Sequence, residues 1–253
     1  MTELPQGSPT LQIADLHYEY PDGTSALRGV DLTIRSGERV AVLGPNGAGK
    51  TTLMLHLNGL LSPASGAVVI EGTPVTPDTA AEIRQRVGLV FQDPDDQLFM
   101  PTVQQDVAFG PANAGLHGEA LESRVKRALR EVDMLSSANR PPHHLSQGQR
   151  RRVAIATVLA SEPDILILDE PSSNLDPTSR REVAEVLERL GRTTVMVTHD
   201  LSYALQLCER SVILSQGRIV ADAPTVELLS NAPLLATHRL ELPYGFDPTK
   251  LSA

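Results

Sequence analysis

Residues Gly44-Pro45-Asn46-Gly47-Ala48-Gly49-Lys50-Thr51 form a glycine-rich stretch that ends in a lysine and a threonine. The apolar run Val40–Leu43 precedes it and predicts a strand buried on both faces of a parallel sheet. Residues 51–60 follow it and predict a helix. A strand, this loop pattern and a helix, in that order, are typical of phosphate binding. The stretch therefore predicts a phosphate site at one edge of an α/β sheet.

Each residue type in this loop meets a need of a polyphosphate ligand. Glycines let several backbone N–H groups point inward without side-chain clashes, and the following helix directs its positive end at the same anion. The ammonium of Lys50 can reach the β- and γ-phosphates, and the hydroxyl of Thr51 can bind Mg²⁺. The residues expected to hold the ligand are Gly44, Pro45, Asn46, Gly47, Ala48, Gly49, Lys50, Thr51 and Thr52.

The composition is that of a folded chain without an excess of positive charge. Of its 253 residues 41% are hydrophobic and 3% aromatic, and 22 Lys and Arg face 31 Asp and Glu, for a net charge of -9. This balance gives no support to a general nucleic-acid binder. The single cysteine, Cys208, excludes a disulfide framework and a cysteine-built zinc site, and we expect it to pack inside. No apolar run reaches about 18 residues and no signal peptide is visible, so we expect a soluble, intracellular chain.

Strands and helices are expected to alternate along most of the chain. Strands are predicted at 11–20, 26–34, 66–70, 87–91, 165–168 and 194–197, with a hairpin over 212–220. Ser146 is expected to cap a helix that runs to about residue 160, and a further helix is predicted at 178–190. Residues 93–142 have helical periodicity with Gly, Pro and Asn breaks and predict an inserted helical segment. This alternation predicts an open parallel α/β sheet.

Two carboxylates, Asp169 and Glu170, directly follow the predicted strand 165–168. Open α/β sheets bind ligands at the carboxyl ends of their strands. We expect Asp169 to help hold Mg²⁺ and Glu170, on the other side of the strand, to orient or deprotonate an attacking water. An Asp-Glu pair alone would indicate only a solvated strand end, and the phosphate loop upstream favours the catalytic interpretation.

Residues Leu145-Ser146-Gln147-Gly148-Gln149 resemble the signature motif of ABC-type ATPases, and the motif order agrees with that family from about residue 11 to residue 217. The resemblance implies a P-loop NTPase core of RecA-like type, an antiparallel β subdomain and a helical subdomain that carries the signature. It implies that the chain hydrolyses ATP with Mg²⁺. The roles that it implies are adenine stacking for Tyr20, the Q-loop glutamine for Gln92, the D-loop for residues 173–176 with Asp176, and the switch histidine for His199.

The resemblance also implies how these residues divide the work. The catalytic residues would be Glu170, His199, Gln92 and Lys50, and Mg²⁺ would be held by Thr51, Gln92 and Asp169. The ATPase cassette would span residues 8–231, with the helical subdomain inserted at about 93–160 and a short C-terminal extension at 232–253.

A second anion site is predicted where Ser146 and Gly148 open a helix. Because the chain already has one phosphate loop, the second site makes sense if it serves the nucleotide of another chain. We therefore expect a head-to-tail dimer with a second copy or a paralogue, stabilised by ATP at the interface. The ATP would lie between Lys50 of one chain and the signature residues Ser146, Gln147, Gly148 and Gln149 of the other. The alternative for Ser146 is an ordinary N-cap.

The stretch Phe91-Gln92-Asp93-Pro94-Asp95-Asp96-Gln97-Leu98-Phe99 resembles the Q-loop of ATPase subunits from energy-coupling-factor transporters, including the cobalt and nickel group. This implies a peripheral protein on the cytoplasmic face of the cell membrane that energises uptake of cobalt, nickel or a vitamin. The implied partners are an integral membrane coupling protein, whose coupling helices would dock on residues 93–142, and a substrate-binding membrane protein. No nucleic acid is implied. Gln147 departs from the family, because glycine is usual there.

Other functions stay open at this point. The chain could serve a transporter for another solute, or it could be a soluble ABC ATPase that acts on ribosomes or chromosomes. Ribosomal types usually fuse two cassettes and chromosomal types carry a long coiled coil, whereas this chain has one phosphate loop and no sustained heptads. A cassette that does not hydrolyse ATP should lack Glu170 or His199, and both are present.

Three further groups have plainer interpretations. Tyr18 shares a strand face with Tyr20, and we prefer Tyr20 as the stacking residue. His143 and His144 are adjacent and are expected on the surface, because such a pair does not face one metal on a helix. The run Arg150–Arg152 is expected to meet nearby acids or nucleotide phosphate.

Overall fold

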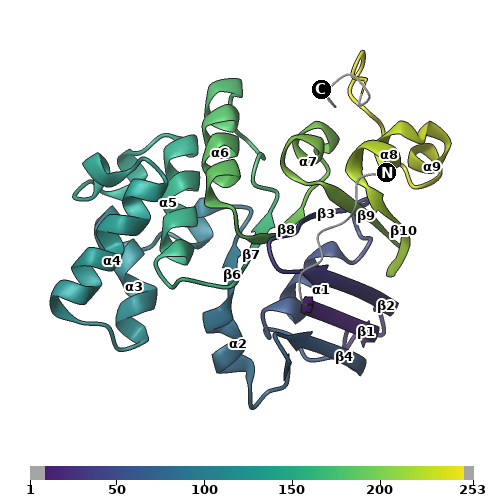
Figure 1. The fold of residues 1–253 in the computed structure, drawn as a ribbon, viewed down its shortest axis with the longest axis horizontal. Helices are drawn as coiled ribbons and strands as arrows, with labels where there is room; N and C mark the ends of the chain where they lie inside the picture. Colours follow the sequence, from purple (N-terminus) through teal and green to yellow (C-terminus); the bar gives the residue numbers. More distant parts are fainter. Residues whose placement is uncertain (1–8, 248–253) are drawn as a thin grey trace. The chain divides into compact units, whose positions relative to one another are not determined.

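The computed structural model describes residues 9–247 of the chain. These residues form a mixed α/β fold that divides into two compact units (Figure 1). Of the described residues, the first unit holds 9–87, 165–167 and 192–247. The second unit holds residues 88–164 and 168–191.

An antiparallel sheet forms one part of the first unit, as the family resemblance implied. Its strands lie in the order β2 (Ser25–Arg35), β1 (Pro9–Glu19), β4 (Ser65–Ile70) and β5 (Thr73–Pro74). The apolar positions of β1 alternate with polar ones, so that Leu11 and Ile13 are buried on one face. This alternation is the signal that predicted both long strands.

A six-stranded sheet contains the strand that precedes the glycine-rich loop. Its order is β10 (Arg218–Pro224), β9 (Arg210–Ser215), β3 (Arg39–Leu43), β8 (Thr193–Val197), β7 (Ile165–Asp169) and β6 (Val87–Val90). Strand β3 is parallel to β8 and β9, whereas β10 pairs antiparallel to β9. The predicted hairpin turn is confirmed, and Gln216 and Gly217 both have positive φ, as a two-residue hairpin turn of type I′ requires.

The helices of the first unit are short. They are α1 (Lys50–Leu57), α2 (Ala80–Arg86), α7 (Leu201–Leu207), α8 (Thr225–Ser230) and α9 (Ala232–Thr237). Helix α1 ends three residues before its predicted end, because Asn58 leaves the helical conformation and Gly59 has a φ of 70°. Cys208 follows α7 and is buried, as expected.

The second unit contains the predicted helical segment. Its helices are η1 (Pro94–Asp96), α3 (Val103–Asn113), α4 (Gly118–Glu131), η2 (Leu135–Ser137), η3 (Pro142–His144), α5 (Gln147–Leu159) and α6 (Pro177–Leu190). Helices α3, α4 and α5 pack against one another, and α6 lies along α5 (Figure 1). Helix α4 is amphipathic and buries Val125, Ala128 and Leu129 on one face.

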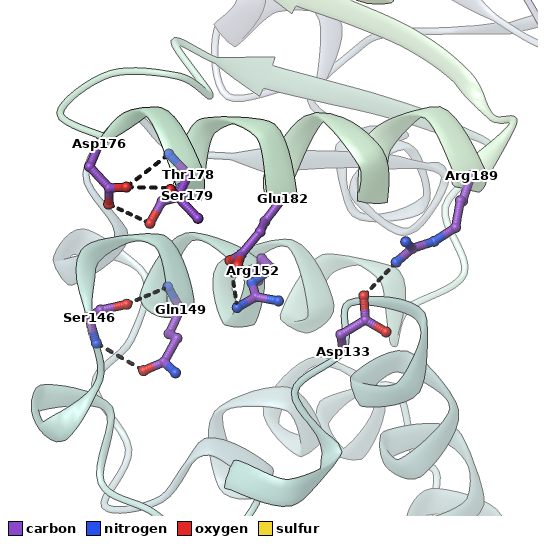
Figure 2. A network of polar contacts seen from close by, with 9 residues as sticks. All are labelled: Asp133, Ser146, Gln149, Arg152, Asp176, Thr178, Ser179, Glu182 and Arg189. Atoms are coloured by element: carbon purple, nitrogen blue, oxygen red, sulfur yellow. Dashed lines mark hydrogen bonds and ion pairs between the residues drawn. The ribbon is translucent and has the colours of Figure 1, made fainter.

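Polar contacts join α5 to α6 and α6 to the chain after α4. Arg152 of α5 forms an ion pair of 3.2 Å with Glu182 of α6, and Arg189 at the end of α6 donates to Asp133 at 2.6 Å (Figure 2).

In residues 9–247, no helix has the length and apolar character needed to cross a membrane.

Candidate active site

The site residues predicted from the sequence fall into two groups. Tyr20, the loop at 44–52 and His199 belong to the first unit. The second unit holds Gln92, Ser146, Gln147, Gly148, Gln149, Asp169, Glu170 and Asp176. Each group has a geometry of its own.

Three glycines shape the loop between β3 and α1. Gly44 has a φ of 152°, and a Cβ there would stand 2.1 Å from the carbonyl oxygen of Leu214. A Cβ on Gly49 would stand 2.6 Å from the carbonyl oxygen of Ala26. Gly47 has a φ of 78° but nothing lies within 4 Å of its added Cβ. The first two glycines therefore let the loop close on β9 and β2, and the third leaves backbone open to a ligand.

Hydrogen bonds from Lys50, within the loop, and from Gly217, in the β9–β10 turn, also hold the loop. The ammonium of Lys50 donates to the carbonyl oxygens of Gly44 at 2.6 Å and Pro45 at 3.1 Å, so a positive charge lies within the loop. The turn residue Gly217 donates to the carbonyl of Ala48 at 3.0 Å and accepts from the N–H of Arg28 at 2.8 Å. The β9–β10 turn thus fixes the loop on the first sheet.

The N-terminus of α1 is built for an anion. Its N-cap is Gly49, which offers no side-chain cap, and its first turn has no acidic residue. By contrast, Ser146, Asp176 and Asp200 cap α5, α6 and α7 with their side chains. The first N–H groups of α1 and the ammonium of Lys50 are a donor set that fits a polyphosphate such as that of ATP.

Tyr20 lies beside α1 in the same unit. Its hydroxyl is 3.0 Å from the hydroxyl of Thr52, and its ring meets Tyr18 edge-on at 5.0 Å. Tyr18 in turn meets His56 at 4.7 Å. Burial lowers the pKa of His56, which favours its neutral imidazole beside the two tyrosine rings. The expectation that Tyr18 and Tyr20 share a strand face agrees with their ring contact.

His199 follows β8 at the carboxyl edge of the sheet. Val42 of β3 pairs with Val197 of β8, and the N–H of Thr198 donates to the carbonyl of Val42 at 3.2 Å. His199 therefore comes after its strand at the level where the phosphate loop begins after β3. Its side chain is exposed, and the next residue, Asp200, caps α7 by accepting from Tyr203.

The second group begins at the end of β7. Asp169 is the last residue of the strand, and Glu170 after it is 8% exposed with a φ of 44°. The N–H of Ser173 donates to the Glu170 carbonyl at 3.0 Å, and Asn174 has a φ of 61°. A left-handed backbone costs stability in a residue other than glycine. Glu170 and Asn174 both have this conformation, the first directly after β7 and the second within the predicted D-loop.

The predicted signature and D-loop meet where α5 and α6 begin (Figure 2). Ser146 forms a capping box with Gln149: its hydroxyl accepts from the Gln149 N–H at 3.2 Å, and the Gln149 side chain accepts from its N–H at 3.0 Å. Asp176 accepts from the N–H groups of Thr178 and Ser179 and from the Ser179 hydroxyl. The hydrogen bond from the Ser179 hydroxyl lowers the pKa of Asp176. The N-cap interpretation of Ser146 is thus confirmed, and its hydroxyl hydrogen can still be donated.

The arginine run was predicted correctly for two of its three members. Arg150 lies 3.3 Å from a carboxylate oxygen of Asp95, and Arg152 pairs with Glu182. Arg151 is instead fully buried and donates to the main-chain carbonyls of Phe91 and Gln92. The burial of Arg151 could have been predicted from helical spacing. Position 151 lies three residues after the buried Gly148, so the two residues share one face of α5. His143 and His144 are exposed, as expected.

Two further features of the described residues concern metal binding and cavities. Residues 9–247 contain no cluster of three or more His, Cys, Asp or Glu side chains arranged to hold a metal ion. Mg²⁺ bound with phosphates usually takes only one or two protein carboxylates, so the predicted set with Asp169 does not need such a cluster. A cavity of about 530 Å³ lies between α3, α4 and η2, and none of the predicted site residues lines it.

Comparison with known proteins places the chain in a family. The model of the family described as "ABC transporter" matches residues 27–173, more than half of the chain. An ABC transporter ATP-binding protein of Streptomyces avermitilis is 63% identical over 97% of this chain and 94% of its own length. The energy-coupling factor transporter ATP-binding protein EcfA of Methanothermobacter thermautotrophicus is 49% identical over 94% of this chain and 78% of its own length.

Solved structures agree with the sequence relatives. The cbiO1 protein of Clostridium perfringens, described as part of the ABC transporter complex cbiONQ, is 38% identical with a TM-score of 0.82 over 93% of this chain and 96% of its own. A dimeric ATP-binding cassette in a post-hydrolysis state with ADP and Pi is 30% identical with a TM-score of 0.75 over 85% of this chain and 98% of its own. The matched family model, these relatives and these solved structures lead to one conclusion: the chain belongs to the ABC transporter family, as an ATP-binding subunit with ATPase activity.

Proposed function

We propose that this ATPase energises uptake of cobalt, nickel or a vitamin through an energy-coupling-factor-type membrane complex. The observation that carries the proposal is the likeness to both EcfA and cbiO1 across more than nine-tenths of the chain. The alternatives are a transporter for another solute and a soluble ABC ATPase without a transport role. The cassette would span residues 8–231, with the helical subdomain at about 93–160 and an extension at 232–253, part of which lies outside the described residues.

ATP would bind to the loop at 44–52, with its adenine on Tyr20. The uncapped start of α1 and the ammonium of Lys50 support this assignment, because both supply positive potential where the phosphates would lie. Mg²⁺ would be held by Thr51, Gln92 and Asp169, and it would neutralise charge on the phosphate oxygens.

The remaining polar groups would carry out hydrolysis. Glu170 would orient or deprotonate the attacking water, and its place directly after the buried strand β7, at the carboxyl end where open α/β sheets bind ligands, supports this role. His199 would contact the terminal phosphate, Gln92 would position Mg²⁺, and Lys50 would stabilise charge on the transferred group.

A second copy of the chain or a paralogue would complete the reaction centre. In this head-to-tail dimer, Ser146, Gln147, Gly148 and Gln149 of one chain would face the ATP held by the other, with Asp176 of the D-loop beside them. The support is the start of α5, where the helix dipole is positive and the Ser146 hydroxyl, which accepts from the Gln149 N–H, keeps its own hydrogen for an anion. ATP bound between two chains would favour the dimer by linkage.

The membrane partner would dock on the second unit, at residues 93–142. Phe99 is 63% exposed and Phe109 is 43% exposed, and their rings meet edge-on at 4.9 Å. Exposed apolar side chains that lie together, unlike single ones, mark surfaces that contact a partner or a membrane. The chain would then work on the cytoplasmic face of the membrane with an integral coupling protein and a substrate-binding membrane protein, and without nucleic acid.

A transport assay tests the proposal. The tagged full chain is expressed in its host, the membrane complex is extracted in detergent and placed in liposomes, and uptake of ⁵⁷Co²⁺, ⁶³Ni²⁺ and labelled vitamins is measured with ATP. We expect ATP-dependent uptake of one of these cargoes and none with the Glu170→Gln chain. Uptake of a different solute supports the first alternative. Recovery of the chain with ribosomes or chromosomal DNA, and with no membrane protein, contradicts the proposal.

A further inference from the structure

Arg151 is a buried cation inside the second unit, one and a half turns into α5. Its side chain is 0% exposed, and its guanidinium donates to the carbonyl oxygens of Phe91 at 2.7 Å and Gln92 at 2.6 Å. The two carbonyls belong to consecutive residues, so the two nitrogens of the planar guanidinium bind adjacent peptide groups of the backbone. A buried charge is costly unless it is hydrogen-bonded, and here these bonds join α5 to the Gln92 loop, residues 91–97.

Gln97 binds the same loop to α5 at two positions that follow Arg151, namely Ala154 and Thr157. Its side-chain nitrogen donates to the carbonyl of Ala154 at 2.8 Å and to the hydroxyl of Thr157 at 2.7 Å. Its side-chain oxygen accepts from the N–H of Phe91 at 3.2 Å. Phe91 is therefore held at both of its main-chain polar groups, one by Arg151 and one by Gln97.

Arg150 adds a third contact, and it reaches the signature residues. It lies 3.3 Å from Asp95 in the loop, and it donates to the side-chain oxygen of Gln147 at 2.5 Å. Gln147 stands where the family usually has glycine. The residues of α5 that contact the loop lie at 150, 151, 154 and 157, a helical spacing that places them along one stripe.

The residues that contact the loop and the signature residues lie on the same helix, α5. The hydrogen-bonded backbone of this helix is rigid between them, and Ser146 lies about 7.5 Å along the helix axis from Arg151, at 1.5 Å per residue. A displacement of the loop must therefore move the start of α5 with it, or break the contacts of Arg151 and Gln97.

We infer that Arg151 is a positioning residue that holds Gln92 on α5, so that Gln92 and the signature turn at Ser146 move as one body. The inference rests on the proposed roles of Gln92 and Ser146. It explains why a cation is buried at this place.

Hydrogen exchange of the full chain without nucleotide tests the clamp directly. In the Arg151→Met chain, we expect amides of residues 91–98 to exchange about tenfold faster or more, because the loop opens locally. The matched control is Arg152→Met, which removes a guanidinium from the neighbouring position of α5 but binds α6. Arg151→Lys should fall in between, because one ammonium cannot reproduce the fork. Equal exchange in the Arg151→Met and Arg152→Met chains overturns the inference.

A double-mutant cycle tests the link to turnover. We expect Arg151→Met to lower kcat about tenfold in the native background and less than about twofold in the Gln92→Ala background, because it acts through Gln92. Equal losses in both backgrounds mean that Arg151 serves only stability and overturn the inference. If Gln92→Ala alone leaves kcat unchanged, the proposed role of Gln92 is wrong, and the exchange experiment still decides whether the clamp exists. Should Arg151→Met not fold, Gln97→Met takes its place in both experiments.

Discussion

Gly148 and Ser179 lie so close that a Cβ on Gly148 would stand 2.5 Å from both Cβ and Oγ of Ser179. A Cβ does not approach a non-bonded heavy atom this closely, so the starts of α5 and α6 would have to move apart. Because Asp176 binds the Ser179 hydroxyl at 2.6 Å, the movement would also disturb the predicted D-loop. The glycine at 148 thus lets the two helix starts approach closely; Figure 2 shows these starts, at Ser146 and Asp176, side by side.

Gly148→Ala should therefore destabilise the chain despite the better helix propensity of alanine. Overpacking costs about 1–3 kcal/mol, whereas alanine gains at most about 1 kcal/mol over glycine in a helix interior. Urea unfolding measures the difference. The double variant Gly148→Ala with Ser179→Gly makes room for the methyl group and should recover much of the loss. A single variant as stable as the native chain contradicts the explanation.

Glu170→Gln should bind ATP and lose turnover by about 100-fold or more, because a general base is removed while shape is kept. ATP should then hold the chain as a dimer, since it is no longer hydrolysed. Steady-state ATPase assays and size-exclusion chromatography with Mg-ATP measure both effects. Glu162→Gln is a matched control, because Glu162 also has a positive φ, of 53°, but pairs with Arg124 and Arg127 instead. Native turnover in the Glu170→Gln chain rejects the assignment.

Local pattern predicted most of the fold. The apolar run of β3, the alternation in β1 and β2 and the Gln216-Gly217 turn each carry their structure within a few residues, and each was predicted close to its observed bounds. The short helices α2 and α8 were missed, because six or seven residues do not complete a clear apolar stripe.

The contacts around Gln92 lay beyond local pattern. Arg151 and Phe91 are sixty residues apart in the chain, and a run of three arginines suggests a solvated surface until tertiary packing buries the middle one. The hydrogen bonds of Gln97 could likewise not be predicted, because its partners Ala154 and Thr157 belong to α5, far along the chain. Buried polar groups are recognised from their partners, and their partners come from distant parts of the sequence.

Tyr20→Ala should weaken ATP binding about 5- to 150-fold, because the stacking of a base on an aromatic ring contributes about 1–3 kcal/mol. Tyr20→Phe keeps the ring and loses only the hydroxyl contact with Thr52, so its affinity should stay within about threefold of native. Titration with a fluorescent ATP analogue measures both. Equal losses in the two variants would mean that the hydroxyl, and not the ring, matters. In neither variant should kcat at saturating ATP fall much.

Cys208 should resist alkylation in the native chain. Burial raises the pKa of its thiol far above neutrality, and the thiolate is the form that reacts. Modification by iodoacetamide should then follow opening of the first unit. Mg-ATP at about 100 times its Kd should slow it about 100-fold if that opening also releases the nucleotide. Mass spectrometry after timed exposure measures the rate. Fast alkylation without denaturant contradicts the burial argument.

Asp106 should make stability depend on pH in a way that the variant Asp106→Asn removes. Its side chain is 3% exposed, and burial raises the pKa of the carboxyl although the N–H groups of Phe99 and Met100 donate to it at 3.0 and 2.9 Å. The folded chain therefore holds this proton more tightly than the unfolded chain. The stability from Asp106 is complete below the usual pKa of aspartate and is lost as pH rises through the raised pKa.

The comparison that isolates this effect is the difference in unfolding free energy between the native chain and Asp106→Asn, measured in urea across a pH series. Asn can accept the same two N–H donors, so its cost is constant with pH. The native advantage should fall from the usual aspartate pKa upward and level off above the raised pKa. Because Asp106 fixes the backbone beside Phe99, exchange of the Phe99 and Met100 amides should stay slow in both chains. A difference that does not vary with pH would mean that the carboxyl is hydrated in the folded chain and that its two N–H donors fully offset burial.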